Sequence, residues 1–232
     1  MKVFAISDLH LSFETEKPMD VFGGNWLNYE DKLKENWQNI VGEEDLVLIA
    51  GDISWAMQLN ETKSDFDFIS NLNGKKVIIR GNHDYWWSTI SAVRNILPRD
   101  MYAIQNDCLR FDNVLLCGTR GWAVPEKGKG QSKEDEKIFE REKIRLDLTL
   151  SAMSKERKDG DTVICMMHYP PFNSDYEHSD FMELLQKYNV DIVVFGHIHG
   201  ITKFDTKMRE INGIKYYLSS CDKLANKPIQ II

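Results

Sequence analysis

The chain has few cysteines and no long apolar run, and each absence excludes a class of protein. No stretch approaches the roughly 18 apolar residues of a membrane-spanning helix, and the N-terminus lacks the pattern of a secretory signal. We therefore expect a soluble protein that does not enter a membrane. The cysteines form neither a CxxC pair nor the spacing of a small disulfide scaffold, which favours free thiols and a cytoplasmic location. They are Cys108, Cys117, Cys165 and Cys221.

Positive charge is also scarce, because 29 lysines and arginines stand against 36 aspartates and glutamates, for a net charge of −7. Proteins that grip long nucleic acids without sequence preference rely on a basic surface, so we expect no such partner. With 42% hydrophobic and 28% charged residues the chain can bury a core. It contains no internal repeat, low-complexity segment or linker. These features predict a single domain over residues 1–232.

What the sequence does contain is a series of short polar blocks, each of which follows an apolar, β-prone run. Open α/β proteins build their sites at the carboxyl ends of strands, so we expect the blocks to meet at one edge of a sheet. The simplest chemistry that uses their oxygen and imidazole groups together is a pair of divalent metal ions. The runs cover residues 3–6, 46–50, 77–79, 163–167 and 192–195. The blocks that follow them are Asp8-Leu9-His10, Gly51-Asp52, Gly81-Asn82-His83-Asp84, His168 and Gly196-His197-Ile198-His199.

Helical patterns alternate with these strands, which predicts an α/β architecture. Residues 101–118 are expected to form two or three short strands, and residues 208–211 and 214–218 a hairpin turned by Asn212-Gly213. The segment over residues 11–29 is longer than an ordinary connection between a strand and a helix, which is typical of a functional loop. Helices are predicted over residues 30–40, 61–72, 84–96 and 133–158.

The ordered set of blocks resembles the calcineurin-like metallophosphoesterase superfamily, whose motifs read D-x-H, GD, GNH[DE], H and GHxH in the same order. The resemblance runs from Asp8 to Gly200, and no motif position departs from the pattern. It implies the metallo-dependent phosphatase fold, a four-layer α-β-β-α sandwich of two mixed β-sheets flanked by helices, classed as α/β or, in some schemes, α+β. Periodicity alone supports only strands that alternate with helices.

The resemblance also implies a role for each residue of the blocks. A metal-bridging hydroxide would attack phosphorus. His83 would assist the leaving group without binding metal, and Asp84 would orient His83 and favour its charged form. Imidazole combined with carboxylate favours two divalent ions of Mn, Fe or Zn. The first ion would be held by Asp8, His10 and His199, the second by Asn82, His168 and His197, and Asp52 would bridge both.

Two bound divalent ions would reverse the local charge of an acidic protein. Against the negative charges of Asp8, Asp52 and a bridging hydroxide, they leave a formal charge of about +1. The predicted substrate is accordingly a small or medium phosphomonoester or phosphodiester. A cyclic-nucleotide phosphodiesterase and a protein Ser/Thr phosphatase are both open as the specific activity. The alternative class is a non-catalytic protein-interaction scaffold on the same fold, and the sequence gives no indication of the oligomeric state.

Several other residues near predicted strand ends have two interpretations. Arg120 could contact phosphate as a planar fork or form a structural ion pair, and Arg80 is expected to be structural. Trp122 and Trp86 could stack on a substrate group, as could Trp55 and Trp87, or all four could pack loops onto the rim. Phe22 and Trp26 could add to that wall. We interpret His178 as an exposed histidine, and Asp112 and Asp222 as turn residues.

Overall fold

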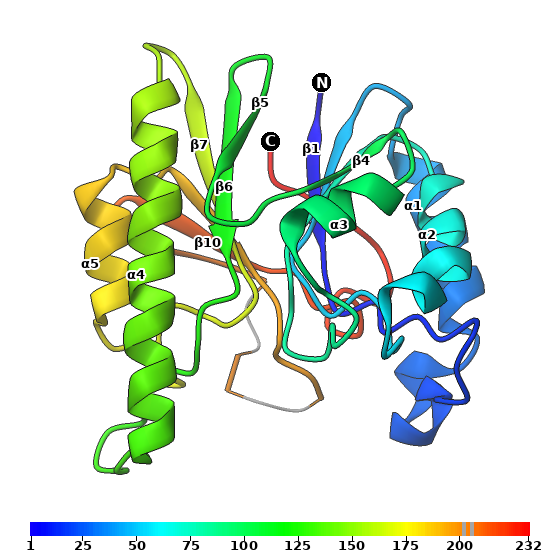
Figure 1. Cartoon of the computed structure of the whole chain (residues 1–232), viewed down its shortest axis with the longest axis horizontal. Coiled ribbons are helices and arrows are strands. Elements are labelled where there is room, and N and C mark those ends of the chain that lie inside the picture. The colour runs from blue at the N-terminus through cyan, green and yellow to red at the C-terminus, as the bar shows by residue number, and fades with distance from the viewer. Residues whose placement is uncertain (201–202, 205–206) are drawn as a thin grey trace.

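The computed structural model describes residues 1–200, 203–204 and 207–232, and two β-sheets stand side by side at its centre (Figure 1). The first sheet has the order β11-β1-β2-β3-β4, in which β11 is antiparallel to β1 and the other pairs are parallel. Its strands are β1 (Val3–Ile6), β2 (Leu46–Ile49), β3 (Lys75–Ile78), β4 (Met101–Ala103) and β11 (Ile229–Gln230).

The second sheet has the order β5-β6-β7-β8-β10-β9. The four inner strands are parallel to one another, and the edge strands β5 and β9 are antiparallel to their neighbours. Both sheets are therefore mixed. The strands are β5 (Cys108–Phe111), β6 (Val114–Thr119), β7 (Thr162–Met167), β8 (Ile192–Phe195), β9 (Met208–Ile211) and β10 (Ile214–Leu218).

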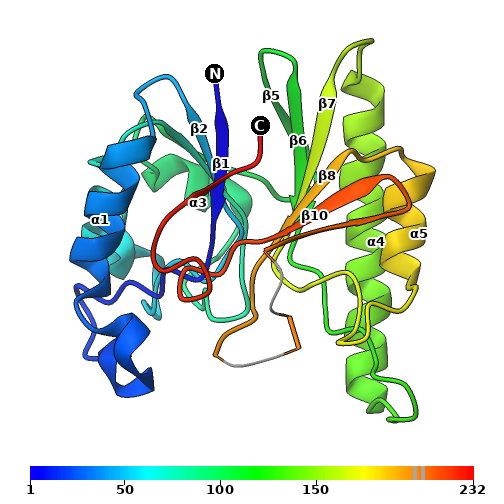
Figure 2. The same ribbon diagram turned by 180° about the vertical axis from the view of Figure 1, so that it is seen from behind.

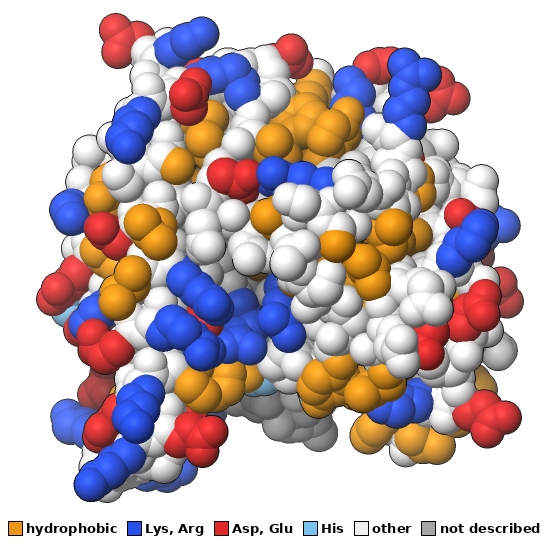
Figure 3. All heavy atoms as spheres, in the orientation of Figure 1, with side chains coloured by type: hydrophobic (Ala, Val, Ile, Leu, Met, Phe, Trp, Pro, Cys, Tyr) orange, Lys and Arg blue, Asp and Glu red, His pale blue; other side chains and the backbone are white. Residues whose placement is uncertain are grey.

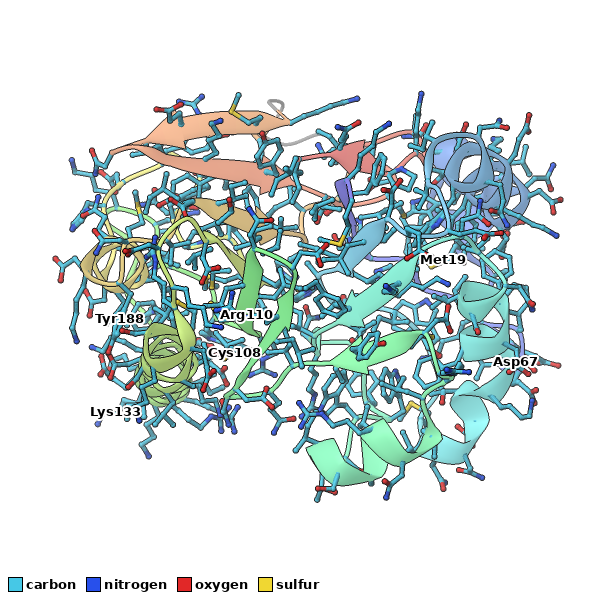
Figure 4. All side chains as sticks on the ribbon, turned by 90° about the horizontal axis from the view of Figure 1, so that it is seen from above. Met19, Asp67, Cys108, Arg110, Lys133 and Tyr188 are labelled. Carbon is cyan, nitrogen blue, oxygen red and sulfur yellow. The ribbon has the colours of Figure 1, made fainter. Side chains whose placement is uncertain are left out.

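Helices cover the outer face of each sheet, as Figures 2 and 4 show from behind and from above. Around the first sheet lie α1 (Tyr29–Ile40), α2 (Lys63–Ser70) and α3 (Ile90–Ile96), and against the second lie α4 (Lys133–Glu156) and α5 (Asp180–Lys187). Short 3-10 helices cover Met19–Phe22 (η1), Gly24–Trp26 (η2) and Leu59–Thr62 (η3). The predicted four-layer α-β-β-α sandwich is confirmed.

The two sheets share a core of apolar side chains, among them Leu48 and Val77 from the first sheet and Ile164 and Val194 from the second. Two further clusters join each sheet to its own helices. Burying these side chains contributes most of the stabilisation of such a sandwich, at about 25 cal/mol per Å². The shared core fixes the sheets relative to each other, so the carboxyl ends of their parallel strands meet at one end of the molecule.

Most predicted elements occur within one or two residues of their predicted bounds, but the helix predicted over 84–96 does not. It begins only at Ile90, after Thr89, whose hydroxyl accepts a hydrogen bond from the backbone of Ala92 at 3.3 Å. The residues before it form a loop, in which the side chain of Asp84 accepts hydrogen bonds from the backbone of Asp52 and Ile53. α5 and β11 were not predicted.

The cysteines are free, as expected. Among the described residues, no helix combines the length and the apolar character needed to cross a membrane.

Candidate metal centre

The polar blocks do meet at the carboxyl ends of the strands, and the backbone there is unusual. Asp8, His10, Asp52 and His197 all have positive φ angles, between 47° and 69°. Residues with a Cβ rarely adopt this region, and such strain persists mainly at functional sites. The blocks that follow β1, β2 and β8 thus each contain a ligand candidate in this strained region.

The motifs contain glycine because the loops that carry them approach one another closely. A Cβ on Gly51 would lie 2.7 Å from Cα of Gly81, and one on Gly81 would collide with the carboxylate and backbone of Asp52. A Cβ on Gly196 would collide with Ser7 and with the Asp8 carboxylate. Only glycine lets the loops pack this closely, which brings the ligand candidates together.

The residues expected at the first ion lie together on the β1 side of the site. Atoms of Asp8, His10 and His199 that could bind metal all lie within 4.8 Å of one another. Nε2 of His199 is 3.3 Å from Oδ1 of Asp8, and Nε2 of His10 is 3.8 Å from Oδ2 of Asp52.

The residues expected at the second ion surround the amide oxygen of Asn82. This Oδ1 is 2.7 Å from Nε2 of His168 and 2.9 Å from Nδ1 of His197. Nε2 of His168 is in turn 3.4 Å from Oδ2 of Asp52. The same carboxylate oxygen of Asp52 thus lies between the two groups of side chains.

The outward nitrogens of two histidines test whether this arrangement fits metal. Nδ1 of His168 lies 2.9 Å from the carbonyl oxygen of Ala50, and Nδ1 of His199 lies 2.9 Å from Oδ1 of Asp222. A hydrogen on each Nδ1 satisfies these acceptors and leaves Nε2 with a lone pair that faces the site, as in metal-binding histidines. Nδ1 of His10 is buried without a hydrogen-bond partner. The donor set fits divalent transition ions.

The buried carboxylates of the site demand positive charge. Burial would raise the pKa of Asp52, but His168 holds it at about 2. Burial would likewise lower the pKa of His168, yet Asp52 outweighs it and raises this pKa to about 9. For His199, Asp222 and Asp8 overcome burial and raise the pKa to about 10. Protons on these imidazoles supply the compensating charge that bound cations would otherwise supply.

Asp222 is a functional residue that the sequence analysis missed. It lies in the turn predicted for it, but it is buried, and its carboxylate accepts hydrogen bonds from His199 Nδ1 and from the backbone of Gly200 at 3.0 Å. Its backbone is held near the site because Cys221 donates to the carbonyl of Ser7. No spacing in the sequence connects residue 222 with the earlier blocks.

The predicted role of Asp84 is wrong. Its buried carboxylate makes no hydrogen bond to His83 in the described part of the chain, and it instead accepts several from the backbone. The donors are the N–H groups of Asp52, Ile53, Ser54 and Gly81, together with the indole N–H of Trp86. Burial and the charge of Asp52 raise the pKa of Asp84 to about 6. Asp84 therefore joins the Gly51-Asp52 turn to the Gly81–Asp84 loop.

Trp86 is buried in this loop, which agrees with its packing interpretation rather than with stacking on a substrate group. Only 2% of the residue is exposed. Its ring packs edge-on against Phe66 at 5.3 Å and beside Trp87 at 5.2 Å. Trp86 and Trp87 thus pack the loop onto the core, which was the alternative interpretation.

His83 lies at the open side of the site and is half-buried. Its backbone N–H donates to Oδ1 of Asp52 at 2.7 Å, and its ring lies 4.7 Å from that of Trp55 and 5.7 Å from that of His10. Burial lowers the pKa of His83, against the charge of Asp52. Its Nδ1 has no hydrogen-bond partner within the part of the chain that the structure describes.

An aromatic pocket of about 710 Å³ opens beside His10, His83 and His199. Its wall comes from the long loop after β1, including Phe22 and Trp26, and from Trp55, whose ring stacks on His10 at 4.8 Å. This volume is in the range of roughly 300–1,000 Å³ typical of small-molecule sites. The expectation that Phe22 and Trp26 add to an aromatic wall agrees with this arrangement.

Arg120 forms the ion pair that was one of its two interpretations, with Nη2 3.2 Å from Oε1 of the buried Glu142. Its guanidinium lies over the ring of Trp122 at 4.9 Å, and the Trp122 indole donates to Asp135 at 3.3 Å. His178 is exposed and pairs with Glu183, and Asp112 is exposed in a turn.

The chain is similar to known proteins in sequence and in fold. The family model described as calcineurin-like phosphoesterase matches residues 1–200. An uncharacterized protein of Methanocaldococcus jannaschii, MJ1445, is 34% identical over 86 residues, which are 36% of this chain and 47% of that protein, so the match spans about half of its length. A probable cyclic nucleotide phosphodiesterase of Coxiella burnetii is 22% identical over 209 residues, 86% of this chain and 76% of its own.

Solved structures share the fold at low sequence identity. The phosphopantetheinyl hydrolase of Mycobacterium tuberculosis matches with a TM-score of 0.58 and 15% identity, over 100% of this chain and 95% of that one. The protein TT1561 of Thermus thermophilus matches with a TM-score of 0.60 and 13% identity, over 98% and 96% of the two chains.

Proposed function

Because this chain belongs to the calcineurin-like phosphoesterase family, whose activity is metal-dependent hydrolysis of phosphoric esters, we propose that it hydrolyses a small or medium phosphomonoester or phosphodiester. The observation that carries the proposal is the position of Asp52. Its Oδ2 lies 3.8 Å from Nε2 of His10 and 3.4 Å from Nε2 of His168, between the two groups of ligand candidates.

We assign the metal ligands accordingly. Ions of Mn, Fe or Zn held there would supply an activated water as the nucleophile and positive charge against the phosphoryl oxygens. Asp222 and the carbonyl of Ala50 orient the imidazoles of His199 and His168, which leaves Nε2 of each toward the site. The first group consists of Asp8, His10 and His199, the second of Asn82, His168 and His197, with Asp52 shared.

We assign to His83 the role of assisting the departure of the leaving-group oxygen. Its backbone N–H is bonded to Asp52, and its ring lines the aromatic pocket beside the ligand candidates His10 and His199. A histidine there can donate a proton or a hydrogen bond to the oxygen that departs from phosphorus. Since Asp84 is occupied by backbone N–H groups, its part in catalysis is to position the loop that carries Asn82 and His83.

The aromatic pocket would hold the leaving group. It touches His83 and two ligand candidates, His10 and His199, and its wall is mainly apolar. The indole N–H of Trp55 is already directed to the sulfur of Met19, at 3.2 Å. An aryl leaving group could pack against the aromatic rings of this wall. The name of the Coxiella relative supports including cyclic nucleotides among the candidates.

Turnover by metal-defined enzyme tests the proposal. After loading with Mn²⁺, we expect hydrolysis of p-nitrophenyl phosphate or its bis ester, lost on chelation and in Asp52→Asn. His178→Ala, which changes an exposed histidine away from the site, serves as the control and should retain full activity. Absence of turnover for both esters and for a panel of cyclic nucleotides, together with no bound metal, would instead favour the interaction scaffold.

We also propose that the protein is cytoplasmic and that it forms a single domain. The free cysteines support a reducing compartment such as the cytoplasm. The core shared by both sheets supports a single domain.

A further inference from the structure

A small cavity on the face between α4 and α3 is lined by three arginines, Arg80, Arg120 and Arg145. We call it the arginine notch. Figure 3 shows Lys and Arg side chains gathered on this face. We propose that the notch binds a second phosphoryl group of the substrate, distinct from the ester that is hydrolysed. This inference rests on the proposed function for its substrate, but anion binding in the notch can be measured without it.

Charge around the notch is unbalanced. Glu142 is fully buried, and its Oε1 lies 2.7 Å from Nη1 of Arg145, 3.2 Å from Nη2 of Arg120 and 3.5 Å from Nη2 of Arg141. One carboxylate therefore serves three guanidinium groups. Arg80 makes no ion pair with any described residue. The site retains a net positive charge that an anion would neutralise.

Two of the arginines that line the notch each have a buried donor that is not satisfied. Nε of Arg80 and Nε of Arg120 are buried and find no hydrogen-bond acceptor among the described residues. Buried polar groups are nearly always paired, and an unpaired one is destabilising. An anion in the notch would place acceptor oxygens beside both arginines. The structure thus has unbalanced charge and unsatisfied donors at the same place.

The notch adjoins the second group of metal ligands. The carbonyl of Arg120 accepts hydrogen bonds from the backbone N–H groups of His168 and Tyr169 at 3.0 and 2.9 Å, and the Tyr169 ring lies 4.0 Å from that of His197. Arg80 directly precedes Gly81-Asn82. The aromatic pocket, in contrast, touches His10 and His199. A substrate could therefore direct its leaving group to the pocket and the rest of the molecule to the notch.

The chemistry of the lining selects phosphate. A guanidinium group can bind two phosphate oxygens at once. The three arginines come from the residues after β3, the residue after β6 and α4. Ser88, Thr119 and Gln105 add polar groups to the lining. A tetrahedral group with several charged oxygens can use more of these donors than a planar carboxylate can.

Binding to metal-free protein tests the notch itself. We would titrate inorganic phosphate into chelator-treated protein and follow ³¹P NMR. Arg145→Gln and Arg80→Gln should each weaken binding by about tenfold or more, in line with losing a charge-assisted pair. Arg141→Gln is the matched control, because Arg141 carries the same charge and touches Glu142 but does not line the cavity. Equal affinity in wild type and both notch variants would overturn the proposal.

A pair of esters then tests whether the phosphate belongs to the substrate. Thymidine 5′-(p-nitrophenyl phosphate) with and without a 3′-phosphate differ only in the second phosphoryl group. With Mn²⁺-loaded wild type and Arg141→Gln, the 3′-phosphate should lower KM about tenfold, and in Arg145→Gln the two KM values should converge. Equal KM values in wild type would overturn the substrate assignment and indicate a site for free phosphate. If phosphate binds the notch but neither these esters, nor p-nitrophenyl phosphate, its bis ester or cyclic nucleotides are hydrolysed, the proposed function is contradicted and the notch is not.

Discussion

The carboxylate of Asp222 lies 2.9 Å from Nδ1 of His199, on the side of the imidazole opposite Asp8. It fixes both the orientation of the ring and the nitrogen that carries the hydrogen. Because the outer partner of a metal-binding histidine typically contributes roughly 10–100-fold in affinity, Asp222 should be needed for metal binding although it is not a ligand itself.

Replacement of Asp222 tests this relationship. Asp222→Ala should weaken binding of one Mn²⁺ ion by about 10–100-fold, measured by calorimetric titration of metal-free protein, and leave the other ion nearly unaffected. Asp112→Ala, in an exposed turn, is the control. Wild-type affinity for both ions in Asp222→Ala would show that His199 needs no such partner.

Replacement of His83 separates chemistry from metal binding. His83→Ala should lower kcat by roughly 10²–10⁴, because the leaving oxygen loses its donor, while the metal content per chain measured by elemental analysis stays at the wild-type value. A fall in metal content parallel to the fall in activity would make His83 a ligand and contradict its assigned role.

Replacement of Asp84 should lower the stability of the folded protein, because its carboxylate accepts hydrogen bonds from the backbone of two loops. Asp84→Asn puts a donor where backbone N–H groups require acceptors, which should cost roughly 2–3 kcal/mol in the free energy of unfolding of metal-free protein in urea. Equal stability of Asp84→Asn and wild type would mean that this carboxylate does not hold the loops.

The aromatic pocket can be filled without touching the ligand groups. A Cβ on Gly24 would meet no atom within 4 Å, so Gly24→Phe should project a ring into the pocket. We expect KM for p-nitrophenyl phosphate to rise about tenfold, the effect of disturbing a modest apolar contact, and KM for glycerol phosphate to change little. Gly130→Phe, at another glycine with open space, is the control. An equal change for both substrates would place the leaving group elsewhere.

The ligand candidates could be found from the sequence because each lies directly after a β-prone run. Parallel strands order their carboxyl ends along one edge, so the position of Asp8, Asp52, Asn82, His168 and His197 in the chain nearly determines their position in space. The bounds of the strands could also be predicted, because buried parallel strands are continuous apolar runs in the sequence.

Other features depended on tertiary contacts that leave no local pattern. The segment over 84–89 has helical composition, but Asp84 accepts backbone hydrogen bonds from two loops, and α3 begins only at Ile90. Trp86 looked like a rim residue until the packing of Phe66 against it was known. The partnership of Asp222 with His199 depends on a turn after β10 that docks on β1 through Cys221 and Ser7.

Anomalous scattering from crystals grown with excess Mn²⁺ tests the central claim most directly. We expect two peaks per chain, one among Asp8, His10 and His199 and one among Asn82, His168 and His197, with the Asp52 carboxylate between them. A map with no peak in this region, or with a single ion that leaves one of the two groups empty, would contradict the account.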